Sequence, residues 1–357
     1  MNKSVIKKQL SFLAKLKQYP LYQKFSDWKA ITFCLQNEWL AITYDNQGHQ
    51  DGAGAQLQRI YGIYALSRFL KVYYIHTPLS YIDYQGISSL ESNSFDHEIA
   101  YRYNQIFSIP SDIICPKEFV EINVNNISLS KLIDLKLTAK KNQNFTLVKI
   151  RYPYDISDNY PQCYEILKSI TPFKFLDNNS SIIRIAVHVR RGDLTFIKQY
   201  NKRILPNDYY IRVMQQLSQI LTELNLQYQF ELYTELPTKT FTISPEQKGI
   251  SAPITESIVV DPNVSKIEEF DVIPNLKKFI NTDAMETMER MAVAHVVVIS
   301  HSSFSYLPSL LNQKGVIIYH QFQHSPLEDW IIADDNGNFS AERFTDKFRK
   351  NFNSFIS

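Results

Sequence analysis

One apolar run that ends in two arginines constrains this chain more than any other feature. Residues 182–189 read IIRIAVHV, and RRGD follows directly at positions 190–193. A near-continuous apolar run is typical of a parallel strand that is covered on both faces. In an open α/β sheet, ligands normally bind at the carboxyl ends of such strands. The stretch therefore predicts an α/β fold with a ligand site at the end of this strand.

The residues at that strand end are suited to an anion. Arg190 and Arg191 each offer a planar set of donors that matches phosphate oxygens, and both stay charged at any working pH. Gly192 lets the backbone turn, and Asp193 can support one guanidinium so that the other is available to a ligand. The same string is also typical of a solvated turn, so the interpretation depends on what else reaches this edge.

The first half of the chain begins with a β-α-β pattern. Residues 40–44 (LAITY) predict a strand, 57–70 an amphipathic helix and 71–75 (KVYYI) a second strand. The loop between strand and helix holds three of the nine glycines in the chain. Gly52 and Gly54, close to the helix start, would let backbone N–H groups approach a phosphate or a sugar. A plain flexible loop is the alternative, and the spacing is not that of a dinucleotide-binding motif.

His76 follows the second of these strands. It could line a cleft at the same edge, or it could have only a structural role.

The second half continues the α/β alternation. We expect helices at 207–224, 283–294 and 307–312, with Asn207 as an N-cap, and strands at 228–234, 254–261, 295–300 and 316–319, the last strand of the chain. Three strand ends should then share one carboxyl edge: the arginine stretch, Glu235, and the stretch from His301 to Ser305. Ser302 and Ser303 precede a helix, so they could bind an anion with hydroxyl and backbone N–H groups or could simply cap the helix.

Composition limits the class of protein. The chain has 357 residues, 44% of them hydrophobic, which suits two globular domains. A net charge of +2 gives no sign of a nucleic-acid-binding surface. Three widely spaced cysteines fit a reducing compartment, and no signal peptide or membrane-spanning stretch is indicated. We expect a cytoplasmic protein, with peripheral membrane contact through the basic N-terminal residues 1–20 as an alternative to packing on its own domain.

Three blocks of the sequence resemble the fucosyltransferase superfamily, which includes α1,2- and α1,6-fucosyltransferases and protein O-fucosyltransferases. They are DGAGAQLQRIYGIYALSRFLKVYYI at 51–75, HVRRGD at 188–193 and ISHSSFSYLPSLLN at 299–312, in the family's order. The arginine block is fairly specific and the serine block moderately so. Residues 80–180 match nothing in the family.

The resemblance implies a GT-B-like fold, in which two Rossmann-like domains face a cleft. The N-terminal domain would be 1–165, on the acceptor side and carrying the glycine-rich loop, and the C-terminal nucleotide-sugar-binding domain would be 166–357. It implies an inverting glycosyltransferase reaction that needs no metal and no cofactor. GDP-fucose would be the donor, and a hydroxyl of a glycan, a lipid-linked oligosaccharide or a protein would be the acceptor.

The resemblance also assigns roles to individual residues. Arg190 would hold the β-phosphate, His188 would lie beside the nucleotide, and Arg191 with Asp193 would shape the turn. The remaining substrate contacts would come from Ser302 and Ser303 on phosphate oxygens, from Gly52 and Gly54 in the other domain, and from Asp283 on guanine or ribose, unless Asp283 only caps its helix.

Two departures from the family bear on the mechanism. Ala55 stands where protein O-fucosyltransferases carry Asn, and Leu194 and Lys198 stand where α1,6 enzymes carry Lys and Glu. The family's base is therefore missing, so either a base is dispensable or it comes from elsewhere, with Asp51, Asp193 and Glu235 as the candidates. The alternatives are a transferase of the same fold that uses another donor, such as a rhamnosyl or galactosyl nucleotide, and a non-catalytic glycan- or nucleotide-binding module.

Overall fold

The structure is a computed structural model that describes residues 38–47, 51–153, 166–174, 182–250 and 254–353. The described residues fall into two compact units. Unit 1 comprises the part up to Gln47 together with Arg59–Pro78 and Ser108–Leu167; unit 2 comprises Gly48–Gln58, Leu79–Phe107 and the part from Lys168 onward. The basic N-terminal residues 1–20 and two of the three cysteines, Cys34 and Cys163, lie outside the described residues.

Unit 1 is built on a sheet of four parallel strands in the order β2-β1-β4-β3. Its elements are β1 (Leu40–Tyr44), β2 (Tyr73–Tyr74), β3 (Val120–Val124), α6 (Leu129–Asn142) and β4 (Thr146–Ile150). All five residues of β1 are buried, as its apolar sequence predicts. Helix α3 (Ala53–Leu70) contributes its first turns to unit 2 and the rest to unit 1.

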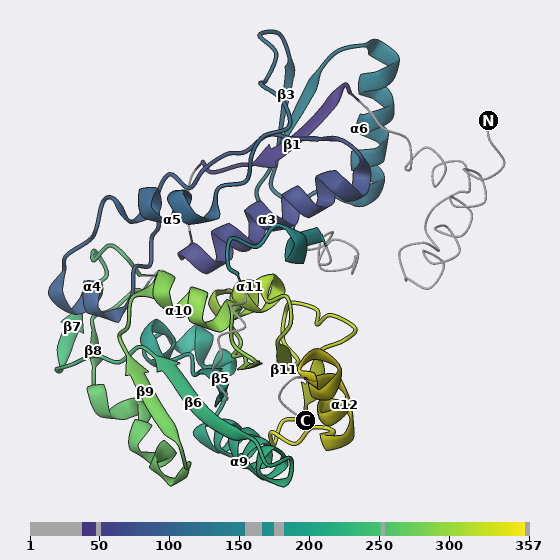
Figure 1. Cartoon of the computed structure of the whole chain (residues 1–357). Coiled ribbons are helices and arrows are strands. Elements are labelled where there is room, and N and C mark those ends of the chain that lie inside the picture. Colours follow the sequence, from purple (N-terminus) through teal and green to yellow (C-terminus); the bar gives the residue numbers. More distant parts are fainter. Residues whose placement is uncertain (1–37, 48–50, 154–165, 175–181, 251–253, 354–357) are drawn as a thin grey trace. The chain divides into compact units, whose positions relative to one another are not determined.

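Unit 2 is built on a sheet of six strands in the order β12-β11-β10-β5-β6-β9, and all neighbouring pairs are parallel. Figure 1 labels β5, β6, β9 and β11 of this sheet. The strands are β5 (Ile182–His188), β6 (Gln227–Thr234), β9 (Leu276–Ile280), β10 (Val296–Val298), β11 (Val316–His320) and β12 (Ile331–Ala333). The expectation that the chain has no strand after 316–319 is wrong, because β12 follows and pairs with β11.

Helices and short elements complete unit 2. The helices are α4 (Ile87–Ser92), α5 (Ile99–Phe107), α9 (Asn207–Glu223), α10 (Ala284–Ala292), α11 (Ser303–Leu311) and α12 (Ala341–Asn351). The 3-10 helices are η2 (Gly192–Thr195), η3 (Lys198–Arg203), η4 (Pro262–Ser265) and η5 (Ile267–Val272), and β7 (Phe241–Ile243) pairs antiparallel with β8 (Ile258–Val260).

One face of the six-stranded sheet forms the main core. Alternate residues of β5, among them Ile183, Ile185 and Val187, pack in one cluster with apolar side chains of α9 and α12, including Phe344 and Phe348. Both helices lie along this sheet in Figure 1. The period-2 spacing on the strands and the helical spacing on α9 explain why the elements meet at these faces.

Two helices begin earlier than their sequence predicts, and one cap is different. Helix α3 begins at Ala53 instead of Leu57, so Gly54 is helical. Helix α11 begins at Ser303 instead of Leu307, because the Ser302 hydroxyl caps it by accepting from the backbone N–H of Phe304 at 3.2 Å. The prediction that Asn207 caps α9 is wrong: Pro206 holds the cap position, and the Asn207 amide is used in tertiary hydrogen bonds.

The fold class is therefore mixed α/β with two parallel sheets, as expected. In unit 2, β5, β6 and β10 are adjacent, so the three predicted strand ends do share one carboxyl edge. No helix among the described residues has the length and apolar character to span a membrane.

Candidate functional site

A pocket opens in unit 2 where β5, β6 and β10 end. Its walls include Arg190, Glu235 and Ser303 from the segments that follow these strands, and Gly54 from the first turn of α3. Its volume is about 170 Å³. Pockets that enclose a whole small-molecule ligand usually measure about 300–1,000 Å³, so this one has room for part of a nucleotide sugar.

Arg190 occupies the centre of the polar wall. Its Nη2 group donates to Oδ1 of Asp193, and its Nη1 group donates to Oε2 of Glu235 at 2.9 Å. Asp193 is 1% exposed, so this carboxylate is held inside the protein by the guanidinium. As expected, Asp193 supports one of the two arginines, which is Arg190. The expectation that the other arginine is then available to a ligand is wrong, because Arg191 does not line the pocket. One positive charge thus faces two carboxylates.

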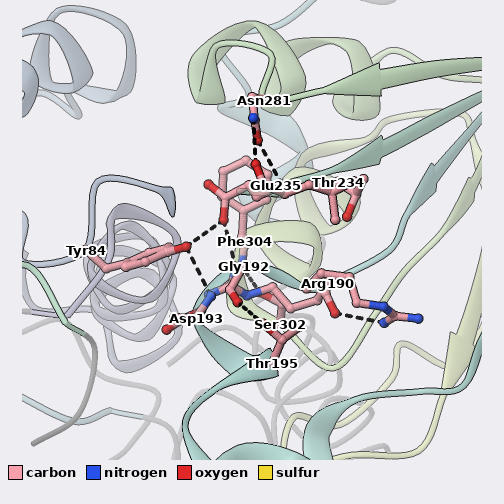
Figure 2. Close-up of polar contacts among 12 residues, drawn as sticks. Tyr84, Arg190, Gly192, Asp193, Thr195, Thr234, Glu235, Asn281, Ser302 and Phe304 are labelled. Carbon is pink, nitrogen blue, oxygen red and sulfur yellow. Dashed lines mark hydrogen bonds and ion pairs between the residues drawn. The ribbon is translucent and has the colours of Figure 1, made fainter. Parts of the chain in front are cut away.

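Glu235 is fixed by a second contact, from a part of the chain far away in sequence. The hydroxyl of Tyr84 donates to Oε2 of Glu235 at 2.8 Å and accepts from the backbone N–H of Asp193 at 3.3 Å, and Figure 2 shows the tyrosine pointing at both. The guanidinium of Arg190 lies over the Tyr84 ring, 5.1 Å from its centre. Tyr84, in the segment before α4, therefore contacts Glu235, the backbone of Asp193 and Arg190 at once.

Two glycines make room for the Glu235 carboxylate. Gly86 has φ +107°, and a Cβ atom there would lie 2.9 Å from Oε1 of Glu235. Gly192 has φ +49°, and its Cβ atom would lie 2.6 Å from Oε2. Left-handed backbone angles favour glycine, and each glycine also leaves the space that the carboxylate fills. The position of Glu235 is thus set on two sides by the backbone.

Burial raises the pKa of Glu235, and the nearby Asp193 carboxylate acts in the same direction. The Arg190 guanidinium and the Tyr84 hydrogen bond oppose the rise without cancelling it. The side chain of Glu235 is 33% exposed. Glu235 is thus a carboxylate of raised proton affinity that still reaches the pocket, which suits a group that takes up a proton.

His188 lies at the end of β5 and is neutral. Its Nδ1 atom is 2.7 Å from the Ser300 hydroxyl, and its ring lies against Phe304 with 5.2 Å between centroids. Burial and the charges of Arg190 and Arg191 lower its pKa to about 3. A neutral imidazole in the wall is available for hydrogen bonding and for packing against a ligand.

The start of α11 forms another wall. The hydroxyl of Ser302 caps the helix, and the hydroxyl of Ser303 lies 3.0 Å from Nε2 of His324. The alternative of helix capping is therefore realised at Ser302. Both serines line the pocket, and the first turn of a nine-residue helix adds the positive end of its dipole there.

The glycine-rich segment meets α11 directly. A Cβ atom on Gly54 would lie 2.6 Å from the backbone Cα of Phe304, so only glycine allows this approach. At Gly52 the nearest atom would be 3.7 Å away, an ordinary contact. Asp51, Gly52 and Gly54 line the pocket as members of unit 2, the unit that holds the strand ends, whereas the resemblance implied that the glycines approach from the other domain.

Three residues expected at the site do not line the pocket. Arg191 is buried, turns away and donates to Oδ1 of Asn207. His76 lies in unit 1, where its Nδ1 atom is 2.9 Å from the Tyr74 hydroxyl. Asp283 caps α10 by accepting from the backbone N–H groups of Met285 and Glu286 at 2.9 and 3.0 Å, so the alternative of a helix cap is the one that the structure favours.

Sequence reasoning missed other side chains in the wall. Tyr84 falls in the stretch that matched no family block, and Arg203 lies at the end of η3, in a segment for which the sequence pattern made no prediction. Several aromatic rings also line the pocket: Tyr103, Tyr200, Tyr233, Phe279 and Phe304. The run Tyr200–Arg203 offered the one local signal, a tyrosine and an arginine shortly after the arginine motif.

No family model matches the sequence, and no curated protein matches it. Among the residues that the structure describes, no three His, Cys, Asp or Glu side chains gather in a way that could hold a metal ion.

Proposed function

We propose that the protein is a glycosyltransferase that moves a sugar from a nucleotide diphosphate donor to an acceptor hydroxyl, with GDP-fucose as the preferred donor. One observation carries the proposal: three adjacent parallel strands end at one pocket, and they bring an arginine, a glutamate of raised pKa and a serine-rich helix start together. The choice of fucose rests on the sequence resemblance alone. So do the GT-B arrangement of the two units and the inverting and metal-independent reaction. The proposed cytoplasmic location rests on the widely spaced cysteines, which fit a reducing compartment.

The reaction requires one proton to move and one bond to break. The acceptor oxygen attacks C1 of the sugar while a base removes its proton. The bond between C1 and the β-phosphate oxygen breaks, and its electron pair leaves with the diphosphate. The site must therefore supply a base on one side of C1 and positive potential on the other.

Glu235 is the base that the geometry favours. Asp193 also lines the pocket, but it is 1% exposed and its Oδ1 atom is already bound by Arg190. Glu235 reaches the pocket, is held by Tyr84 and Arg190, and has a raised pKa, which favours proton uptake. Asp51 also lines the pocket and is the competing candidate.

Two helix starts support binding of the departing diphosphate. The first turns of α3 and α11 meet at Gly54 and Phe304 in the wall of the pocket. Helix N-termini present backbone N–H groups and a positive partial charge, and both stabilise phosphate groups. Preorganised donors of this kind usually contribute the largest part of catalysis in such reactions.

A thermal-shift panel of GDP, UDP, TDP, CMP and GDP-fucose, each with and without EDTA, tests the proposal. A ligand at 100 times its dissociation constant should stabilise the fold by about 2.7 kcal/mol. A GDP-selective shift that EDTA leaves unchanged supports a fucosyltransferase. A shift selective for UDP or TDP would indicate another donor, binding without turnover would indicate a non-catalytic module, and no shift with any nucleotide would remove the proposal.

A further inference from the structure

The positive charge of Arg190 is already neutralised by two carboxylates, so it is not available to a diphosphate. Arg190 is bound by both Asp193 and Glu235, so this group of three carries a net charge of −1 when both carboxylates are ionised. Arg191 is buried away from the pocket beside Asn207. A diphosphate that met only this wall would be repelled by it, because like charges at short range raise the free energy of binding.

Arg203 is the other guanidinium in the pocket wall. It is half-buried, and within the described residues it forms no ion pair; its guanidinium lies over the ring of Tyr200 at 5.0 Å. Asp51 and Asp193 are close enough to act on it electrostatically, and Arg190 acts in the opposite sense. A partly buried charge without an ionic partner is costly unless something else supplies the counter-charge.

We infer that Arg203 binds the diphosphate group of the donor in this pocket and supplies the positive charge that Arg190 cannot. The inference rests on the proposed function. Stacking on Tyr200 holds the guanidinium plane in place, and a planar pair of donors matches two phosphate oxygens. In this arrangement, Arg190 positions Glu235 and Asp193, and Arg203 contacts the ligand.

Titration calorimetry with inorganic pyrophosphate, GDP and guanosine tests this division of roles. Arg203→Ala should weaken binding of pyrophosphate and GDP by about 10- to 100-fold, the value of a charge-assisted hydrogen bond, and should leave guanosine unaffected. Arg203→Lys should recover part of the loss, because it restores the charge without the planar fork, and it covers the case in which the alanine variant fails to fold. Lys202→Ala is the matched control, since Lys202 is exposed and carries the same charge one position earlier.

Unchanged pyrophosphate affinity in Arg203→Ala would overturn the inference, and so would wild-type protein that binds neither pyrophosphate nor GDP. Turnover of GDP-fucose by the wild-type protein tests the proposed function separately. Turnover together with an unaffected Arg203→Ala variant would remove only the inference. Diphosphate binding that depends on Arg203, without turnover of any nucleotide sugar, would keep Arg203 as a diphosphate ligand and remove the proposed function.

Discussion

The carboxylate of Glu235 fills the space that a side chain on Gly192 would need. A Cβ atom at Gly192 would lie 2.6 Å from Oε2 of Glu235, and the backbone of Gly192 is in the left-handed region at φ +49°. The glycine of the arginine motif thus has two roles, since it allows the turn after β5 and admits the glutamate that follows β6.

Replacement of Gly192 by alanine should therefore damage the site as well as the fold. We expect a loss of about 1–3 kcal/mol in the free energy of unfolding and loss of donor turnover in the protein that remains folded. Gly337→Ala is the matched control, because Gly337 has φ +85° and its Cβ atom would lie 2.5 Å from the backbone oxygen of Tyr209, away from the pocket. Folded Gly192→Ala protein with normal turnover would contradict the role of this space.

Glu235→Gln should abolish proton removal and keep the shape of the pocket. A general base contributes about 10²–10⁴ to the rate, so kcat for transfer should fall by that factor while donor affinity changes little. Asp51→Asn is the comparison. If Asp51→Asn lost the activity and Glu235→Gln kept it, Asp51 would be the base.

The raised pKa of Glu235 predicts a pH profile with a definite sign. Activity should fall as pH decreases through the pKa of Glu235, which lies above the ordinary value for glutamate of about 4.3. The same shift means that the folded state binds this proton more tightly than the unfolded state, so the contribution of Glu235 to stability is lost as pH rises through the pKa. Glu235→Gln should remove both effects; an unchanged pH profile of stability in that variant would contradict the raised pKa.

Tyr84→Phe removes one hydroxyl that orients Glu235. Loss of a hydrogen bond to a charged group should lower turnover about 10-fold. Because that bond lowers the pKa of Glu235 in the intact protein, the acid limb of the pH–rate profile should move to higher pH in the variant. A fall in rate with no displacement of the limb would indicate that Tyr84 acts on something other than Glu235.

His188 should make the protein less stable in acid. Its pKa is lowered to about 3 in the folded state, against an ordinary value near 6.5 in the unfolded chain. Between these values only the unfolded state takes up the proton, so the free energy of unfolding should fall by about 1.4 kcal/mol per pH unit as pH decreases. His188→Gln should reduce this slope by one proton; His301, whose pKa is lowered to about 4, contributes in the same way.

Denaturant titrations from pH 4 to 7 would measure this slope. His97→Gln, at an exposed position, is the control for loss of an imidazole elsewhere. An identical slope in wild type and His188→Gln would show that His188 is protonated in the folded state.

The sequence predicted the edge of the sheet well because the information there is local. Apolar runs ending in Arg190, Glu235 and His301 mark parallel strands and their carboxyl ends without any knowledge of the fold. Helix starts were less certain, since the residues 53–56 read as a glycine-bearing loop and only the close approach of Gly54 to Phe304 explains why glycine stands inside the helix.

The partners that complete the site could not be predicted in this way. Tyr84 contacts Glu235 across 151 positions of sequence, and no period or motif links the two. The direction of Arg191 depends on Asn207, whose amide also binds the backbone oxygens of Ser265 and Lys266. Such contacts are fixed by tertiary packing, so the residue pattern alone identified an arginine pair, and only the family resemblance singled out Arg190 for the pocket.

The most direct test of the central claim is proton NMR of GDP-fucose incubated with the wild-type protein, with and without EDTA, with Glu235→Gln as the comparison. With water in place of the acceptor hydroxyl, we expect release of GDP and appearance of fucose, with the anomer opposite to that of the donor formed first. The rate should not change with EDTA and should fall at least 100-fold in Glu235→Gln. GDP-fucose that stays intact, together with the absence of turnover of any other nucleotide sugar, would contradict the claim that this pocket transfers sugars.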